Sequence, residues 1–172
     1  RHRYMVKNLA IMPGVGVEYN HITTNGQVQN IWEPYAQLQF NLNLQKGFGM
    51  ELSYSYYETN PSIGQLSETN QWLDTKLVYH GNPNLRAYKT HNVSLFASWY
   101  YNRYFMFNMT ASYDNMPGYI LDHFVTTNDF YLQTLENMKR FSELKGNLNI
   151  YVYPFGRNNF TLMSQLIGGK IW

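Results

Sequence analysis

The chain has 172 residues, of which 17% are aromatic and only 14% are charged, and its formal net charge is +2. This composition excludes a disordered chain, which has high charge and few aromatics, and a coiled coil, which is rich in Ala, Glu, Lys and Leu. It also excludes nucleic acid as a partner, because no basic cluster exceeds a pair. Cysteine is absent, which excludes disulfides and thiolate metal sites.

The dominant pattern along the chain is a strict alternation of apolar and polar residues, which is typical of β-strands with two different faces. Between Tyr35 and Gln45 every second residue is apolar and the intervening residues are amides. A Lys46-Gly47 turn follows, and alternation resumes at Phe48. These residues are therefore predicted to form a β-hairpin with one apolar and one polar face.

Seven long strands are predicted in all. The first contains Pro13, Gly14 and Gly16, which indicate a bulge or an edge. The only helix expected is a single turn around Ser62 to Ser67, after Pro61. The predicted strands cover residues 5–19, 28–45, 48–60, 89–102, 103–126, 129–153 and 159–172.

The apolar positions keep the same parity from one hairpin to the next, so they are predicted to share one side of one antiparallel sheet. The residues in this prediction are Ala36, Leu38, Phe40, Leu42, Leu44, Met50, Leu52, Val93, Leu95, Phe107 and Met109.

The connections between the predicted strands are of two kinds. Those at 46–47, 102–103 and 154–158 are short, whereas 61–88 is long and shares its side with 20–27 and 127–128. Consecutive antiparallel strands reverse direction, so the two sets should lie at opposite ends of the sheet. Aromatic residues gather beside the short connections, as in the girdle at a membrane interface.

Short turns, one long loop, an apolar face and an amide-rich face together indicate a bacterial outer-membrane barrel. The predicted fold class is all-β: an antiparallel up-and-down meander of about seven to eight long strands, forming a segment of a transmembrane β-barrel. Residues 1–172 are expected to form a single such segment. Seven strands cannot close a standard barrel, whose strand number is even, so a larger barrel is expected.

Three segments carry a family resemblance: PSIGQL at 61–66, GNPNLR at 81–86 and HNVSL at 91–95. Spaced in this way between two alternating strands, they resemble the barrels of TonB-dependent receptors, and most closely an outer-membrane β-barrel group of nutrient-scavenging gut bacteria. Arg86-Ala87 stands where that family has Lys-Pro. The resemblance extends from Tyr35 to Trp172.

The resemblance implies a place in the bacterial outer membrane and a part in importing a scarce nutrient, such as a glycan, a peptide or a metal chelate. It implies outer-membrane lipid, the remainder of the barrel with its plug, and an energy-coupling inner-membrane complex as partners. It also places loop 61–88 outside the cell. The aromatic and histidine side chains of that loop are candidates for binding the ligand: Trp72, Tyr79, His80 and Tyr88.

No enzyme, cofactor or metal site is expected. The five histidines have no metal-ligand spacing, and no nucleophile-elbow or phosphate-loop motif is present. The alternative reading is a small complete β-barrel or β-sandwich with a structural or adhesive binding role. Counting residues 74–80 as an eighth strand would permit it.

Overall fold

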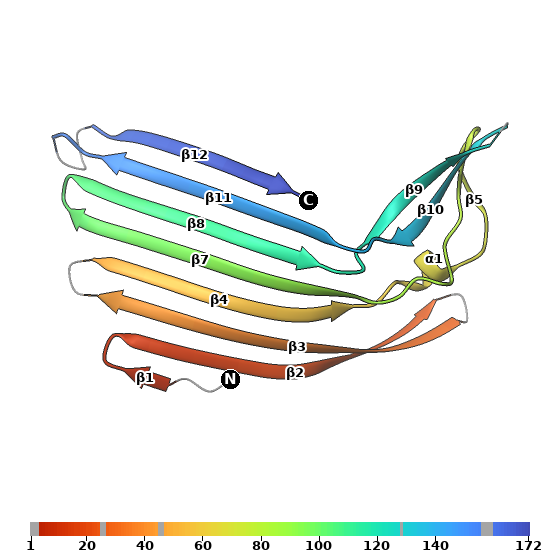
Figure 1. The fold of residues 1–172 in the computed structure, drawn as a ribbon, viewed down its shortest axis with the longest axis horizontal. Coiled ribbons are helices and arrows are strands. Elements are labelled where there is room, and N and C mark those ends of the chain that lie inside the picture. Colours follow the sequence, from red (N-terminus) through yellow and green to blue (C-terminus); the bar gives the residue numbers. More distant parts are fainter. Residues whose placement is uncertain (1–3, 25–26, 45–46, 128, 156–159) are drawn as a thin grey trace.

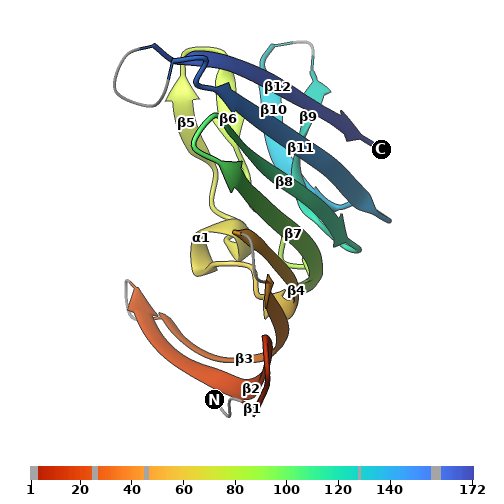
Figure 2. The same cartoon turned by 90° about the vertical axis from the view of Figure 1, so that its left-hand side faces the viewer.

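The computed structural model describes residues 4–24, 27–44, 47–127, 129–155 and 160–172. They form one long curved sheet, called the wall below, and a smaller sheet beyond one end of it, called the loop sheet (Figure 1). Figure 2 shows the curvature of the wall. No helix in these described ranges is long and apolar enough to cross a membrane.

The wall has eight strands in the order β1-β2-β3-β4-β7-β8-β11-β12, and every neighbouring pair is antiparallel. This order confirms the up-and-down meander predicted from the alternating pattern. The wall strands are β1 (Tyr4–Val6), β2 (Leu9–Thr24), β3 (Gln27–Leu44), β4 (Phe48–Thr59), β7 (Tyr88–Asn102), β8 (Phe105–Met116), β11 (Phe141–Val152) and β12 (Leu162–Ile171).

The loop sheet has the order β5-β6-β10-β9, and its β6–β10 pair is parallel. Its strands are β5 (Gln71–Asp74), β6 (Leu77–Tyr79), β9 (Ile120–Thr126) and β10 (Tyr131–Asn137). The helical turn α1 (Ile63–Leu66) lies in the same long connection as β5 and β6, where a single turn was predicted.

The strand register confirms that the predicted apolar residues share one side of the wall. Leu38 pairs with Tyr54, which pairs with Val93 on the next strand. Phe40, Leu52 and Leu95 form the adjacent row. We call this side the apolar face and the other side the polar face. Valines and leucines of the apolar face reach exposed fractions of 83% at Val15 and 69% at Leu166.

Three predicted strands have the wrong extent. The predicted strand 5–19 is two strands, β1 and β2, joined by a tight turn in which Lys7 has a φ of 52°. The predicted strands 103–126 and 129–153 are each divided, because β9 and β10 leave the wall for the loop sheet. Pro117-Gly118 marks the first division, where Gly118 adopts a φ of 79° that favours glycine.

The alternative of a β-sandwich is wrong, because the loop sheet lies beyond the end of the wall and does not cover one of its faces (Figure 1). Residues 74–80 do contain a strand, β6, but it belongs to the loop sheet. Strands β1 and β12 do not pair with each other within the described residues, so the wall is an open sheet there.

The connections divide between the two ends of the wall as predicted. The β3–β4, β7–β8 and β11–β12 ends lie together, and the loop sheet lies at the opposite end (Figure 1). Parts of the predicted connections lie outside the described residues, namely positions 25–26, 46, 128 and 156–158. The strands on either side of them fix the two ends.

Candidate functional site

The apolar face forms a continuous band across the wall. One row of cross-strand partners is Met50, Ala97, Met109, Leu148 and Leu166. On β7 the band extends from Trp99 to His91, about 27 Å along the strand at about 3.4 Å per residue. Barrel strands are tilted by about 40°, which shortens this to about 20 Å across the membrane, close to the apolar height of an outer-membrane barrel.

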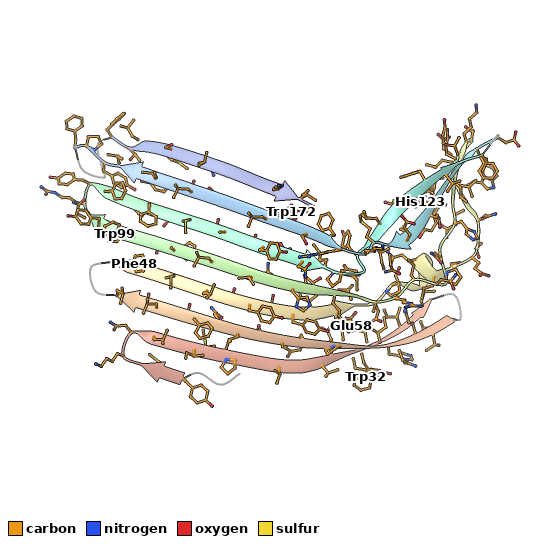
Figure 3. The ribbon with its side chains drawn as sticks, viewed as in Figure 1. Trp32, Phe48, Glu58, Trp99, His123 and Trp172 are labelled. Carbon is orange, nitrogen blue, oxygen red and sulfur yellow. The ribbon has the colours of Figure 1, made fainter. Side chains whose placement is uncertain are left out.

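Aromatic rings gather at the short-turn end of this band. The ring of Trp99 packs edge-on against Tyr101 and Phe107, with centroid distances of 5.0 and 6.1 Å. Arg103 lies over the ring of Tyr104 at 4.7 Å. Figure 3 shows Trp99 and Phe48 together at this end. The aromatic cluster predicted beside the short turns is therefore present, at the position that an interfacial girdle occupies.

The polar face lines a hollow of about 840 Å³ on the inside of the curved wall, with Glu51, Phe96 and Lys145 among its lining residues. Lys145 is 2.8 Å from Glu143, and the amide of Asn92 donates to Asp114 at 2.7 Å. These charged and amide groups suit contact with water and polar solutes, whereas the apolar face suits lipid.

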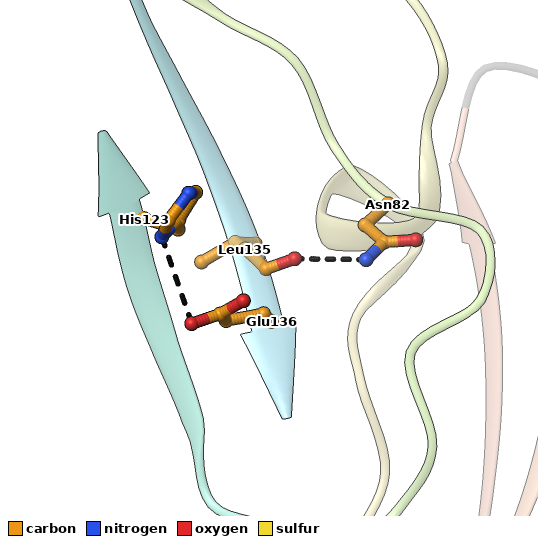
Figure 4. Close-up of polar contacts among 4 residues, drawn as sticks. All are labelled: Asn82, His123, Leu135 and Glu136. Atoms are coloured by element: carbon orange, nitrogen blue, oxygen red, sulfur yellow. Dashed lines mark hydrogen bonds and ion pairs between the residues drawn. The ribbon is translucent and has the colours of Figure 1, made fainter. Parts of the chain in front are cut away.

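The GNPN segment fastens the long connection to the loop sheet. The backbone N–H of Asn82 donates to the carbonyl of Gln65 at the end of α1 (2.7 Å). Its side-chain amide donates to the carbonyl of Leu135 on β10 (2.8 Å; Figure 4). Ser62 and Gln65 close a capping box around α1. Two of the three segments that carry the family resemblance, 61–66 and 81–86, therefore have a structural role: they hold the long connection against β10, whereas the third, 91–95, lies in β7 of the wall.

A second amide joins the base of the loop sheet to the wall. Asn137 accepts from the backbone of Arg86 at 2.9 Å and donates to the carbonyls of Arg86 and Gly118, at 2.9 and 2.6 Å. Because these partners come from two different connections, Asn137 holds both connections at one end of the wall.

The four predicted ligand residues all lie at the loop end, but the structure does not place them on one surface. Trp72 pairs with Val78 in the register of the loop sheet, so Trp72 and the adjacent Tyr79 point to opposite faces. Trp72 is 64% exposed, and its ring packs edge-on against Phe130. Their role in ligand binding remains a prediction.

The other two predicted ligand residues have local partners. His80 shares a hydrogen bond with Asn70 at 2.8 Å. Tyr88, at the start of β7, packs edge-on against Tyr119 with a centroid distance of 5.2 Å. Burial raises the pKa of Tyr79, and the Asp122 carboxylate raises it further, so its hydroxyl remains a donor at neutral pH.

Sequence reasoning missed the exposed aromatics of β9 and β10, because it assigned these segments to membrane strands. Phe124 and Tyr131 are 60% and 52% exposed on the loop sheet. The signal was available in Pro117-Gly118 and in the charged residues that follow it. His123 and Glu136 approach to 3.6 Å across the two strands, both largely in solvent (Figure 4). In the part of the chain that is described, no three acidic or histidine side chains gather as metal ligands.

We predict that Asn82→Ala loosens the loop sheet without affecting the wall. The substitution leaves the Leu135 carbonyl without its partner, which costs about 1–3 kcal/mol of local stability. Limited proteolysis of intact cells should therefore cleave segment 61–88 faster in this variant. Asn84→Ala is the matched control. Asn84 donates its backbone N–H to Oδ1 of Asn82, and the substitution leaves this hydrogen bond in place. Equal cleavage of both variants would contradict the role assigned to Asn82.

Comparison with known proteins agrees with this geometry. The model of the outer membrane protein beta-barrel family matches residues 5–168. No curated protein sequence matches the chain significantly. Among solved structures, the crystal structure of the siderophore receptor PirA from Pseudomonas aeruginosa is similar, with a TM-score of 0.70 and 13% sequence identity. The match covers 97% of this chain and 32% of the receptor chain, so this chain spans about a third of that receptor's length.

Proposed function

Because the chain belongs to the outer membrane protein β-barrel family of the bacterial outer membrane, we propose that it forms the wall of a TonB-dependent receptor that imports a scarce nutrient. The nutrient is a glycan, a peptide or a metal chelate. The protein binds and translocates this solute and carries out no covalent chemistry on it.

The observation that carries the proposal is the separation of the two faces of the wall. Every second residue of consecutive strands is apolar, while the other side of the wall lines a hollow of about 840 Å³ that includes Glu51, Glu143 and Lys145. An import barrel needs both surfaces, because its outer surface contacts lipid and its inner surface must let a hydrated solute pass. The similarity to a siderophore receptor supports the same function.

Loop 61–88 lies outside the cell in this proposal, because long connections face outward in this class. Trp72 and Tyr88 offer aromatic surfaces to the incoming nutrient, and Tyr79 and His80 offer hydrogen bonds. Further barrel strands close the barrel, because unpaired strand edges are not tolerated in lipid, and a plug occupies its lumen. An energy-coupling complex in the inner membrane drives the transport.

The test is an uptake experiment on strains with and without the full-length protein. Labelled ferric siderophore, oligosaccharide and short peptide are supplied in turn. We expect the deletion to abolish uptake of one class, and an uncoupler of the proton-motive force to have the same effect. Uptake of all three classes without change would refute the import function. Binding to intact cells without uptake would favour an adhesive role instead.

A further inference from the structure

A cluster of polar and cationic side chains interrupts the apolar face at its loop end. In the strand register, Tyr113 pairs with Val93 and Leu144, and Lys170 pairs with Leu144. These positions belong to the apolar face, two residues from the row that contains Leu95. We call the group the outer cluster; its members are Tyr113, Asn115, Arg140, Ser142, Lys170 and Trp172.

Hydrogen bonds fix the edge of the Arg140 guanidinium group that carries Nε and Nη2. Nε donates to Oδ1 of Asn115 (2.8 Å) and to Oγ of Ser142 (3.1 Å), and Nη2 donates to the Tyr113 hydroxyl (2.9 Å). Both N–H groups of Nη1, and one of Nη2, have no partner among the described residues. The guanidinium group is therefore fixed in place with one side open to a ligand.

Lys170 supplies a second cation to the outer cluster, through the ring of Trp172. Its ammonium group lies 5.2 Å from the centroid of the Trp172 ring, which in turn lies 6.4 Å from the ring of Tyr113. Within the described residues, no carboxylate comes within 4.0 Å of either cation. A hollow of about 300 Å³ lies among Tyr113, Arg140, Ser142 and Trp172.

Arg140 and Lys170 have no carboxylate partner within the described residues, and such cations are costly on a face that meets lipid unless an anion neutralises them. Tyr113 and Lys170 lie in the Val93 row and Asn115 pairs with His91, so the cluster occupies the last rows of the apolar band at its loop end. Tyr and Trp rings are typical of the level of the lipid headgroups. Phosphate is the anion found at that level, and it accepts two hydrogen bonds from a guanidinium group.

We propose that the outer cluster binds the phosphate of an outer-leaflet lipid A molecule. Arg140 holds the phosphate through its open side, Lys170 supplies the second positive charge, and the Trp172 ring packs against the sugar or the acyl region. This inference rests on the proposed placement of the long connections outside the cell, which puts the cluster in the outer leaflet.

The experiment measures lipid A binding to the purified full-length protein in neutral detergent. The arms are wild type, Arg140→Gln, Lys170→Gln, the double variant and the control Arg103→Gln, which removes the same charge at the short-turn end. Resistance to SDS without boiling verifies that each variant is folded. We expect about tenfold weaker binding for each cluster variant, because each loses a charged contact, and no change for Arg103→Gln.

Three ligands identify the source of the phosphate. Dephosphorylated lipid A should bind the wild type with no higher affinity than intact lipid A binds the double variant. If millimolar inorganic phosphate displaced bound lipid A as effectively as unlabelled lipid A does, the lipid assignment would be overturned. Preference for phosphatidylglycerol vesicles over lipid A would overturn the outer-leaflet placement. Equal lipid A affinity of folded wild type and folded double variant would refute the site. None of these results depends on which nutrient is imported.

Discussion

Leu95→Arg should sharply reduce the folded, membrane-inserted yield of the protein. Leu95 lies on the apolar face within the row of Leu52 and Ala111. An arginine at mid-bilayer depth on the lipid face of a barrel costs about 2–4 kcal/mol. Trp99→Arg, at the short-turn end, should cost only about 0–1 kcal/mol, because a charge near the interface reaches the headgroups.

The matched control for Leu95→Arg places the same side chain on the polar face. Asn41 pairs directly with Glu51 across the β3–β4 hairpin. Asn41→Arg therefore adds an opposite-charge cross-strand pair, which stabilises by up to about 1 kcal/mol. Folded yield is measured for all three variants as resistance to SDS without boiling. Equal losses for Leu95→Arg and Asn41→Arg would mean that the apolar face does not meet lipid.

Gly81→Ala should separate the long connection from α1 and expose the loop sheet. A Cβ at this position would lie 2.5 Å from the carbonyl oxygen of Ser67 and 2.6 Å from that of Gln65. Both are backbone atoms, so the segment itself must shift, at a cost typical of overpacking, about 1–3 kcal/mol. Hydrogen exchange of residues 61–88 should accelerate, whereas exchange in the wall strands should not change.

Gly64→Ala is the matched control in the same connection. Gly64 lies in α1, and a Cβ there has nothing within 4 Å. Alanine favours a helix over glycine by up to about 1 kcal/mol, so exchange in the segment should slow or stay the same. If hydrogen exchange of residues 61–88 accelerated in both variants, the effect of Gly81→Ala could not be attributed to the close contact at Gly81. In the proposed receptor, Gly81→Ala should also lower nutrient uptake.

The wall is the part of the molecule that local sequence predicts well. Each hairpin joins neighbouring segments, and a period of two assigns each side chain to a face once one residue is placed. The parity of residues 36–44, 48–56 and 91–99 was therefore readable from the sequence, and the register confirms it. The strand ends were less accurate, because alternation continues past the point at which β8 ends.

The loop sheet and the outer cluster required the tertiary structure. Leu77 pairs with Tyr131 in a parallel ladder that joins two separate connections, and no local pattern specifies such a partner. Arg140, in the connection before β11, likewise meets Tyr113 of β8, 27 residues away in sequence. Local alternation predicts which side of a strand faces lipid, because successive side chains of a strand point to opposite faces. Contacts between distant connections depend on the whole chain being folded, because only the assembled wall brings their ends together.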